Sequence, residues 1–267
     1  MRLDQLLTER GLARSRAEAQ AVILAGDVVL EGAATRRLKP GQLVDAEVGL
    51  TVVERPRWAS RAGAKLEHAL DTFGVDHTGF ACLDAGASTG GFTDVLLARG
   101  ARIVYAVDVG RAQLIDRLRR DPRVVSMERT NLRELRELPE PIDLATLDLS
   151  FISLGAVLGT VRALLSERGR VIALVKPQFE AGRGAVPRGG VVRDPEVWLR
   201  VLEEVAEAVG RAGLDAHRAI ASPIAGGDGN VEFLVDLRQE PARLDGYARS
   251  VADAVRVAAA RAHEAGA

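Results

Sequence analysis

The chain has 267 residues, of which 47% are hydrophobic, so it can bury a substantial core in one large domain or in a small domain followed by a medium one. Its formal net charge of −1 excludes a uniformly basic surface, and any contact with nucleic acid must therefore come from a local patch. The N-terminus does not resemble a signal peptide and no uncharged apolar run reaches the roughly 18 residues of a membrane helix, so we expect a cytoplasmic protein without a membrane partner.

Residues 1–54 are predicted to form a small α/β module. The segment from Leu3 to Arg10 carries its leucines on one face and is expected to be helical. Ser15 precedes a second helix and has Glu18 three residues later, which is the spacing of a capping box. Strands are expected at residues 28–30 and 43–48, with a basic loop between them.

This arrangement resembles the S4 RNA-binding domain over nearly the whole module. The resemblance implies contact with RNA through residues at the start of the second helix and in loops, here Arg2, Arg14, Ser15, Arg16, Arg36 and Lys39. A helix N-terminus flanked by guanidinium groups is a suitable site for a phosphate. The alternative is an ordinary solvated surface, because residues 1–40 hold seven basic and five acidic side chains.

Residues 55–64 are predicted to be a linker and residues 65–267 a second domain, in which strands and helices alternate as in a doubly wound parallel sheet. Strands are expected at residues 81–85, 103–108, 124–127, 143–148, 171–176, 218–222 and 231–237, and helices at 91–99, 112–119, 154–166, 195–211 and 242–262. Seven strands that end in a hairpin-like pair resemble the order of a Rossmann-like methyltransferase, so the expected fold class is α/β with such a domain of seven mostly parallel strands after the small module. The single cysteine, Cys82, lies in the first of these strands and is expected to be a buried structural thiol without a metal.

The most specific short motif follows that strand, a loop with the glycine pattern G-x-x-x-G-G. Glycines at such a position let the backbone approach a ligand and adopt positive φ, and these folds bind ligands at the carboxyl edge of the sheet. Nicotinamide enzymes carry G-x-G-x-x-G instead. The loop resembles the first motif of S-adenosylmethionine-dependent methyltransferases, which implies cofactor contacts by Asp84, Gly86, Ala87, Ser88, Thr89, Gly90, Gly91 and Phe92.

Polar residues after the next two strands extend the predicted cofactor site. Asp108 ends the second strand, where a carboxylate can accept hydrogen bonds from a ribose diol. Glu128 and Asn131 follow the third strand, a usual place for contacts near an adenine, and Asp148, at the end of the fourth strand beside the cofactor crevice, is also a predicted cofactor contact. An NAD ribose would make the same demand on Asp108, so a nicotinamide enzyme stays as the alternative to S-adenosylmethionine.

Only three of the 36 basic residues are lysines, namely Lys39, Lys65 and Lys176. Arginine stays charged in proteins, whereas a desolvated lysine can lose its proton. An unperturbed lysine with a pKa of about 10.4 is neutral in roughly one molecule in 2,500 at pH 7, so a catalytic base needs a lowered pKa. The scarcity of lysine indicates that the remaining lysines have a chemical role, although a compositional bias toward arginine would also leave few lysines.

Two of these lysines join two carboxylates in a candidate catalytic group. Asp148 and Lys176 end the fourth and fifth strands, Glu232 begins the last strand and Lys65 precedes the first. The order resembles the K-D-K-E tetrad of ribose 2′-O-methyltransferases. We assign Lys176 as the base and Asp148 as the group that orients it, with Lys65 and Glu232 positioning the ribose hydroxyl. The alternative is a structural ion pair between Lys176 and Glu232.

From residue 3 to about 237 the chain resembles the hemolysin A family. The resemblance is carried by the S4-like module, by the Arg57-Trp58-Ala59 hinge, by the glycine loop and by residues 60–66, 148–154 and 175–180. It implies methylation of cytidine 2′-hydroxyls in ribosomal RNA within ribosomal subunits, in the large subunit alone or in both. The oligomeric state stays open.

The stretch from Phe179 to Arg193 is predicted to be a mobile basic loop in which Arg183 and Arg188 contact RNA, although an ordinary connection is the alternative. Two other functions are weighed against methyl transfer. One is an RNA-binding protein whose methyltransferase fold performs no transfer. The other is a membrane-lytic hemolysin, which would need an amphipathic or spanning segment that the sequence does not show.

Overall fold

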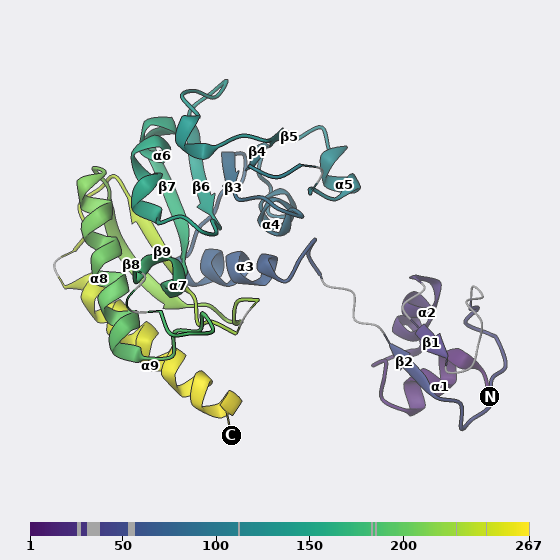
Figure 1. The fold of residues 1–267 in the computed structure, drawn as a ribbon. Helices are drawn as coiled ribbons and strands as arrows, with labels where there is room; N and C mark the ends of the chain where they lie inside the picture. The colour runs from purple at the N-terminus through teal and green to yellow at the C-terminus, as the bar shows by residue number, and fades with distance from the viewer. Residues whose placement is uncertain are drawn as a thin grey trace. The chain divides into compact units, whose positions relative to one another are not determined.

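The computed structural model describes residues 1–25, 28–30, 38–52, 57–111, 113–182, 184, 186–227, 229–243 and 245–266. The chain divides into two compact units, Met1–Arg57 and Trp58–Ala267, and each is described by itself (Figure 1). Residues 58–64, which the sequence analysis assigned to the linker, belong to the second unit, where helix α3 already begins at Ala62.

The first unit packs two helices on a two-stranded antiparallel sheet. Its elements are α1 (Leu3–Glu9), α2 (Arg16–Ala25), β1 (Val28–Leu30) and β2 (Leu50–Val52). Its core is small and contains Leu3, Leu7, Ala19 and Ile23. At the start of α2 the Ser15 hydroxyl accepts a hydrogen bond from the Glu18 N–H at 3.2 Å, as expected of an N-cap.

The strand predicted at residues 43–48 is wrong. Only Leu43 makes an isolated bridge there, to Arg2, and the chain then turns at Asp45, whose side chain accepts from the Glu47 N–H at 3.0 Å. An aspartate that binds the backbone two residues on favours a turn over a strand. The strand that pairs with β1 is β2, a few residues later.

The second unit contains one seven-stranded sheet in the order β5-β4-β3-β6-β7-β9-β8. Its strands are β3 (Ala81–Ala85), β4 (Ile103–Asp108), β5 (Val124–Glu128), β6 (Ile142–Leu147), β7 (Leu165–Val175), β8 (Asp215–Ala221) and β9 (Phe233–Arg238). All neighbours are parallel except β9, which runs antiparallel to both β7 and β8. Because β3 is covered on both faces it is buried along its whole length, and its residues are apolar except for Asp84.

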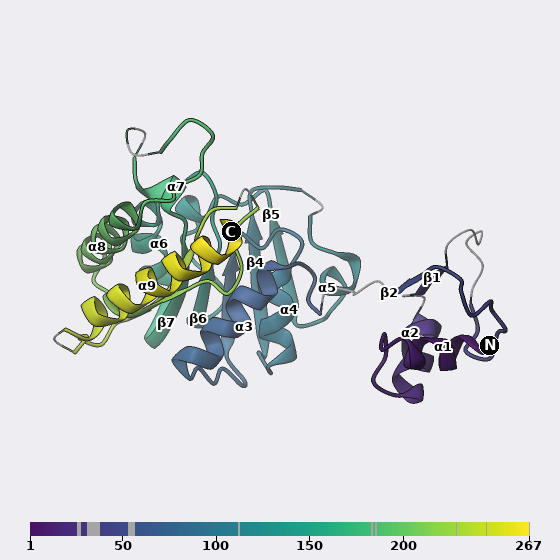
Figure 2. The same ribbon diagram turned by 90° about the horizontal axis from the view of Figure 1, so that it is seen from below.

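Helices cover both faces of this sheet. The first face carries α3 (Ala62–Phe73), α4 (Gly91–Ala98) and α5 (Asp116–Arg119), with α3 and α4 side by side in Figure 2. The other face carries α6 (Leu158–Leu164) and α8 (Pro195–Arg211), and α9 (Gly246–Gly266) packs against α8 and β8. Shorter pieces are the 3-10 turns Leu132–Glu134 and Leu154–Ala156 and the single turn α7 (Pro177–Glu180).

Two predicted helices differ from the structure. The helix expected at 154–166 is interrupted at Val157, whose φ of −121° and ψ of −19° separate a 3-10 turn from α6. The helix expected at 112–119 is present only from Asp116, and residue 112 lies outside the described residues. Both changes fall in segments that follow the carboxyl ends of β4 and β6.

Candidate active site

The strand register brings three of the four candidate catalytic residues to one edge of the sheet. Val175 is opposite Phe233 in the antiparallel β7–β9 pair, so continuing the ladder by one residue places Lys176 opposite Glu232. Asp148 directly follows β6, which lies beside β7 and runs parallel to it. Asp148 and Glu232 are more than 80 positions apart in the sequence, and they become neighbours only through the sheet.

The amine of Lys176 is held by two side chains from the segment after β6. Its Nζ lies 2.6 Å from Oδ1 of Asp148 and donates a hydrogen bond to Oγ of Ser150 at 3.1 Å. The Phe179 ring centroid lies 6.0 Å from the same nitrogen. Three contacts on one amine fix its position, and Ser150 is a contact that the sequence analysis did not assign.

Lys65 and Glu232 form the second ion pair of the group. Lys65 reaches from α3 to Oε2 of Glu232, and the two residues are 7% and 3% exposed. The backbone of Gly226 closes against the other side of this carboxylate, because a Cβ there would lie 2.5 Å from Oε1 of Glu232. Glu232 therefore pairs with Lys65 rather than with Lys176, in contrast to the alternative considered from the sequence.

The glycine loop between β3 and α4 folds as a tight turn against the segment after β6. Gly86 has a φ of +84°, and a Cβ on it would lie 2.3 Å from the carbonyl oxygen of Asp148. A side chain is thus excluded at Gly86 by both conformation and space. Ser88, with a φ of +47°, donates its N–H to Oδ2 of Asp108 at 2.8 Å, which joins the loop to the end of β4.

A cavity of about 400 Å³ opens between this loop and the ends of β4 and β6. Five of the predicted cofactor residues line it, namely Gly86, Ser88, Asp108, Asn131 and Asp148. The Asp108 carboxylate also accepts from the Gly110 N–H at 2.7 Å, which aims it along the cavity wall. Sequence reasoning missed the other lining residues Val107, Val109, Gln113, Thr130, Leu132, Leu149, Ser150, Phe151, Ile152 and Val157.

The remaining predicted cofactor residues do not line the cavity: Asp84, Ala87, Thr89, Gly90, Gly91, Phe92 and Glu128. Phe92 is 3% exposed and belongs to the core, and a Cβ on Gly90 would collide with Leu118 at 2.3 Å. Except for Glu128, which ends β5, these residues belong to β3, the loop or the start of α4 and support the loop from behind. The motif pattern alone could not separate ligand contacts from supporting positions.

Asp84 is the clearest of these supporting residues. It is fully buried, and its carboxylate accepts hydrogen bonds from Thr93 Oγ1 at 2.6 Å and Thr146 Oγ1 at 3.4 Å. Burial raises the pKa of Asp84 to about 7. The side chain therefore ties β3 to α4 and β6 underneath the loop.

In the first unit, two predicted RNA-binding arginines are engaged with a buried aspartate. Asp4 accepts from Arg2 Nε and Arg16 Nε, each at 3.0 Å, and from Gln20 at 3.0 Å. The hydrogen bond from Arg2 is the main reason that the pKa of Asp4 lies well below its usual range. Arg2 and Arg16 remain about half exposed while doing so, and they would have to bind RNA and Asp4 together.

The other predicted RNA contacts differ in availability. Arg14 and Lys39 are exposed, and among the described residues neither side chain has an ion pair. The Ser15 hydroxyl is used as the cap of α2. Arg36 and Arg183 lie outside the described residues.

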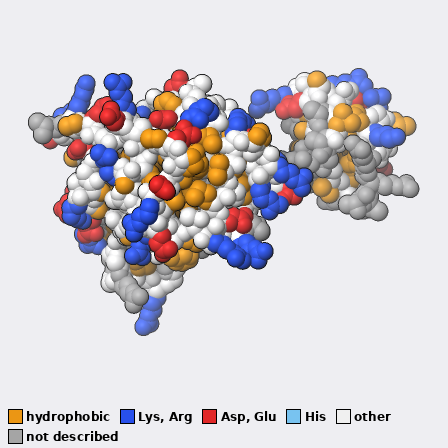
Figure 3. All heavy atoms as spheres, turned by 90° about the horizontal axis from the view of Figure 1, so that it is seen from above, with side chains coloured by type: hydrophobic (Ala, Val, Ile, Leu, Met, Phe, Trp, Pro, Cys, Tyr) orange, Lys and Arg blue, Asp and Glu red, His pale blue; other side chains and the backbone are white. Residues whose placement is uncertain are grey.

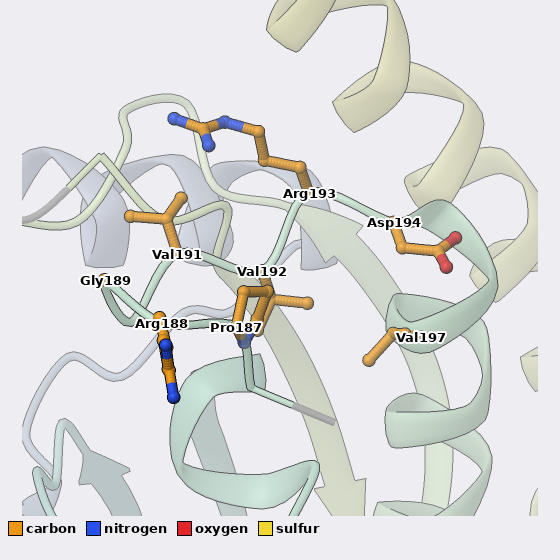
Figure 4. Close-up of a pocket in the computed structure, with 8 residues that line it drawn as sticks. All are labelled: Pro187, Arg188, Gly189, Val191, Val192, Arg193, Asp194 and Val197. Carbon is orange, nitrogen blue, oxygen red and sulfur yellow. The ribbon is translucent and has the colours of Figure 1, made fainter. Parts of the chain in front are cut away.

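The described part of the basic loop is anchored rather than loose. Oδ1 of the buried Asn230 accepts from the Val192 N–H at 2.9 Å, its Nδ2 donates to Gly190 at 3.0 Å, and Trp198 Nε1 donates to the Val192 carbonyl at 3.1 Å. The loop borders a pocket of about 520 Å³ beside the start of α8. In Figure 4, Arg188 and Arg193 extend from it in different directions, so they do not form one clamp.

Charges of both signs are interspersed on the face of the second unit that is seen in Figure 3. Figure 3 shows Lys and Arg side chains interspersed with Asp and Glu around an area of hydrophobic side chains. This agrees with the near-zero net charge of the chain. Among the described residues, none of the helices is both long and apolar enough to cross a membrane.

Comparison with known proteins gives this arrangement a family. Residues 58–239 match the FtsJ-like methyltransferase family and residues 1–47 match the S4 domain. The chain is 47% identical to the 16S/23S rRNA (cytidine-2′-O)-methyltransferase TlyA of Mycobacterium tuberculosis, over 91% of each chain. It is 40% identical to Hemolysin A of Brachyspira hyodysenteriae, over 88% of this chain and 98% of that protein.

A solved structure of a provisionally named hemolysin from Streptococcus thermophilus covers 99% of this chain and 98% of its own, with 39% identity and a TM-score of 0.75. The α/β fold with a seven-stranded, mostly parallel sheet is the one predicted, and S-adenosylmethionine is the cofactor of the matched methyltransferase family. The cavity fits that cofactor, because it combines a glycine loop that excludes side chains with a carboxylate at the end of β4. The chain belongs to the TlyA/hemolysin A family of FtsJ-like rRNA methyltransferases with an N-terminal S4 domain.

Proposed function

We propose that this protein transfers a methyl group from S-adenosylmethionine to the ribose 2′-hydroxyl of a cytidine in ribosomal RNA. The observation that carries the proposal is the amine of Lys176, held 2.6 Å from Asp148 at the edge of the cofactor cavity. The relatives named as cytidine 2′-O-methyltransferases supply the substrate class. Action on ribosomal subunits would place the protein in the cytoplasm.

Gly86, Ser88, Asp108 and Asn131 would hold the cofactor in the cavity that they line. When bound, S-adenosylmethionine supplies an electrophilic methyl group. The ribose hydroxyl must lose its proton as it becomes the nucleophile, and we assign Nζ of Lys176, in its deprotonated form with a free lone pair, as the acceptor of that proton. Asp148 and Ser150 hold this nitrogen in place. A base that is already aligned with the ribose hydroxyl increases the rate of proton transfer.

The buried pair of Lys65 and Glu232 would bind the ribose. One oxygen of Glu232 is already engaged by Lys65, and its other oxygen lies against the Gly226 backbone. The pair leaves no unpaired buried charge, and a ribose hydroxyl would reach Glu232 from the pocket that it lines with Ser222 and Ile224. Arg14 and Lys39 would contribute contacts to RNA phosphates from the S4 domain.

The test is to incubate the protein with ribosomal subunits that lack 2′-O-methyl cytidine and tritiated S-adenosylmethionine, and then to map the modified nucleotides. Label at a cytidine 2′-oxygen in one or both subunits is the expected result. Label on a base, or no transfer to either subunit with a correctly folded, cofactor-binding protein, contradicts the proposal.

A further inference from the structure

Two segments that carry the candidate catalytic residues Asp148 and Lys176 are connected by three sets of contacts. The first segment, residues 148–154, follows β6, and the second, residues 176–180, follows β7. In the first set, Lys176 contacts Asp148 and Ser150. In the second set, the rings of Phe179 and Phe151 pack with their centroids 5.0 Å apart.

Glu180 makes the third connection. Its Oε2 accepts a hydrogen bond from the Ser153 hydroxyl at 2.8 Å, and its Oε1 accepts from the Leu154 N–H at 2.8 Å. Both carboxylate oxygens of a residue four positions after Lys176 are thus committed to the segment that begins at Asp148. Burial raises the pKa of Glu180, and the two donors act against that rise. A partly buried carboxylate with two well-placed donors makes a defined bridge rather than a solvated surface group.

Core packing holds the first segment at Leu149, Ile152 and Leu154 but not at Phe151, which lies between them. Phe151 has a φ of +64° and is 89% exposed, so its conformation is not held by core packing. A bulky residue in the left-handed region persists only where its surroundings determine it. The contacts on either side of it are those of Lys176 and Phe179 on one side and of Glu180 on the other.

We propose that Glu180 is a positioning residue for Lys176. By accepting hydrogen bonds from Ser153 and Leu154, Glu180 holds the first segment next to the second. Asp148 and Ser150 are thereby kept within contact distance of the Lys176 amine. The link to methyl transfer rests on the proposed function, which makes Lys176 the base. The link between Glu180 and the amine stands on the geometry alone.

The chain offers an unusually direct readout because it contains only three lysines. Protein labelled with 13C at the lysine ε-carbon gives three signals, and Lys176→Arg and Lys39→Arg assign them. In Glu180→Ala we expect the Lys176 signal to shift or broaden and its titration midpoint to change, while the Lys65 signal stays as in the wild type. We also expect kcat for ribosomal subunits to fall on the order of ten- to a hundredfold, with a smaller change in KM, as for other misplaced catalytic groups.

Glu180→Gln is the conservative variant. Its carboxamide can accept from the Leu154 N–H and donate to the Ser153 hydroxyl, so it should restore the Lys176 signal and most of kcat. Glu207→Ala removes an exposed glutamate of α8 that pairs loosely with Arg211 at 3.7 Å and serves as the matched surface control. Ser153→Ala, which removes one of the two bonds, provides a milder variant if Glu180→Ala does not fold.

The proposal is overturned, whatever the activity, if the Lys176 signal and its titration midpoint are unchanged from the wild type in both Glu180→Ala and Ser153→Ala. Equal loss in the alanine and glutamine variants also overturns it, since the bridge would then not be the cause. A wild-type protein that methylates no ribosomal RNA, yet whose Lys176 signal responds to Glu180→Ala, refutes the proposed function and leaves the positioning role supported.

Discussion

Lys176 and Glu232 stand opposite each other at the end of the β7–β9 ladder, yet each pairs with a third residue. Lys176 binds Asp148 from the neighbouring parallel strand, and Glu232 binds Lys65 from α3. Two cations and two carboxylates are thereby matched one to one. Neither lysine depends on the other pair for its counter-charge, so the two pairs can be perturbed separately.

Replacing Lys176 by arginine should abolish methyl transfer and leave the affinity for S-adenosylmethionine within a few-fold of the wild type. Arginine keeps the positive charge but cannot accept a proton, and Lys176 does not line the cofactor cavity. A tritiated-methyl assay on ribosomal subunits gives the first quantity and calorimetry the second. Substantial activity in this variant would rule out Lys176 as the base.

Removing one partner of the buried second pair should destabilise the second unit. Glu232→Gln leaves the amine of Lys65, which is 7% exposed, without its counter-ion, and we expect a loss of about 3 to 5 kcal/mol in the free energy of unfolding. Combining it with Lys65→Met should recover much of that loss. Both tryptophans, Trp58 and Trp198, lie in this unit, so urea unfolding followed by their fluorescence reports on it. Additive effects of the two substitutions would contradict a coupled pair.

The buried Asp84 should make stability depend on pH. Its pKa is about 7 in the folded protein, against an ordinary value of 3.8, so the folded state binds the proton more tightly. The resulting stabilisation is fully present below about pH 4 and is lost as the pH rises through about 7. Burial lowers the pKa of His77 and acts in the opposite direction in acid.

Asp84→Asn isolates the first effect, because His77 is present in both proteins. The difference in unfolding free energy between the variant and the wild type should grow in favour of the variant from pH 5 to pH 8. A pH-independent difference would show that the carboxyl group does not titrate in this range.

Charge reversal at Arg14 should weaken binding to ribosomal subunits and reduce the salt slope of the affinity by about one. Arg14 is preferred to Arg16, because reversal at Arg16 would also disturb the buried Asp4. Arg200→Glu, on the exposed side of α8, is the matched control. An unchanged salt dependence measured by filter binding would count against an RNA contact at Arg14.

Asn230→Ala should release the loop that carries Arg188 and Arg193. The variant loses hydrogen bonds to both Val192 and Gly190, so limited trypsin digestion should cut after these arginines on the order of tenfold faster, as expected for a locally opened segment. Asn230→Asp keeps only the acceptor and should be intermediate. Equal digestion rates would mean that Trp198 alone is sufficient to anchor the loop.

The sequence predicted the type of most elements correctly, whereas the strand at 43–48 and several boundaries, such as the start of β7 at Leu165, were wrong. Strands such as Ala81–Ala85 and Ile103–Asp108 are apolar runs with a polar residue near the carboxyl end, and the helix Pro195–Arg211 has a capping aspartate and a proline at its start. The glycine loop and the scarcity of lysine are also properties of the sequence alone. Such signals depend on neighbours within a few residues, which is why they can be read without the fold.

Tertiary structure alone decided how distant residues are joined. Lys65 and Glu232 are 167 positions apart, and no local pattern specifies that they pair with each other rather than with Lys176 or Asp148. The burial of Asp84 and the bridge from Glu180 to Ser153 likewise arise only where separate strands end side by side. Local periodicity sets which face of an element is apolar, whereas strand order and register set which side chains meet, and these follow from packing the whole sheet.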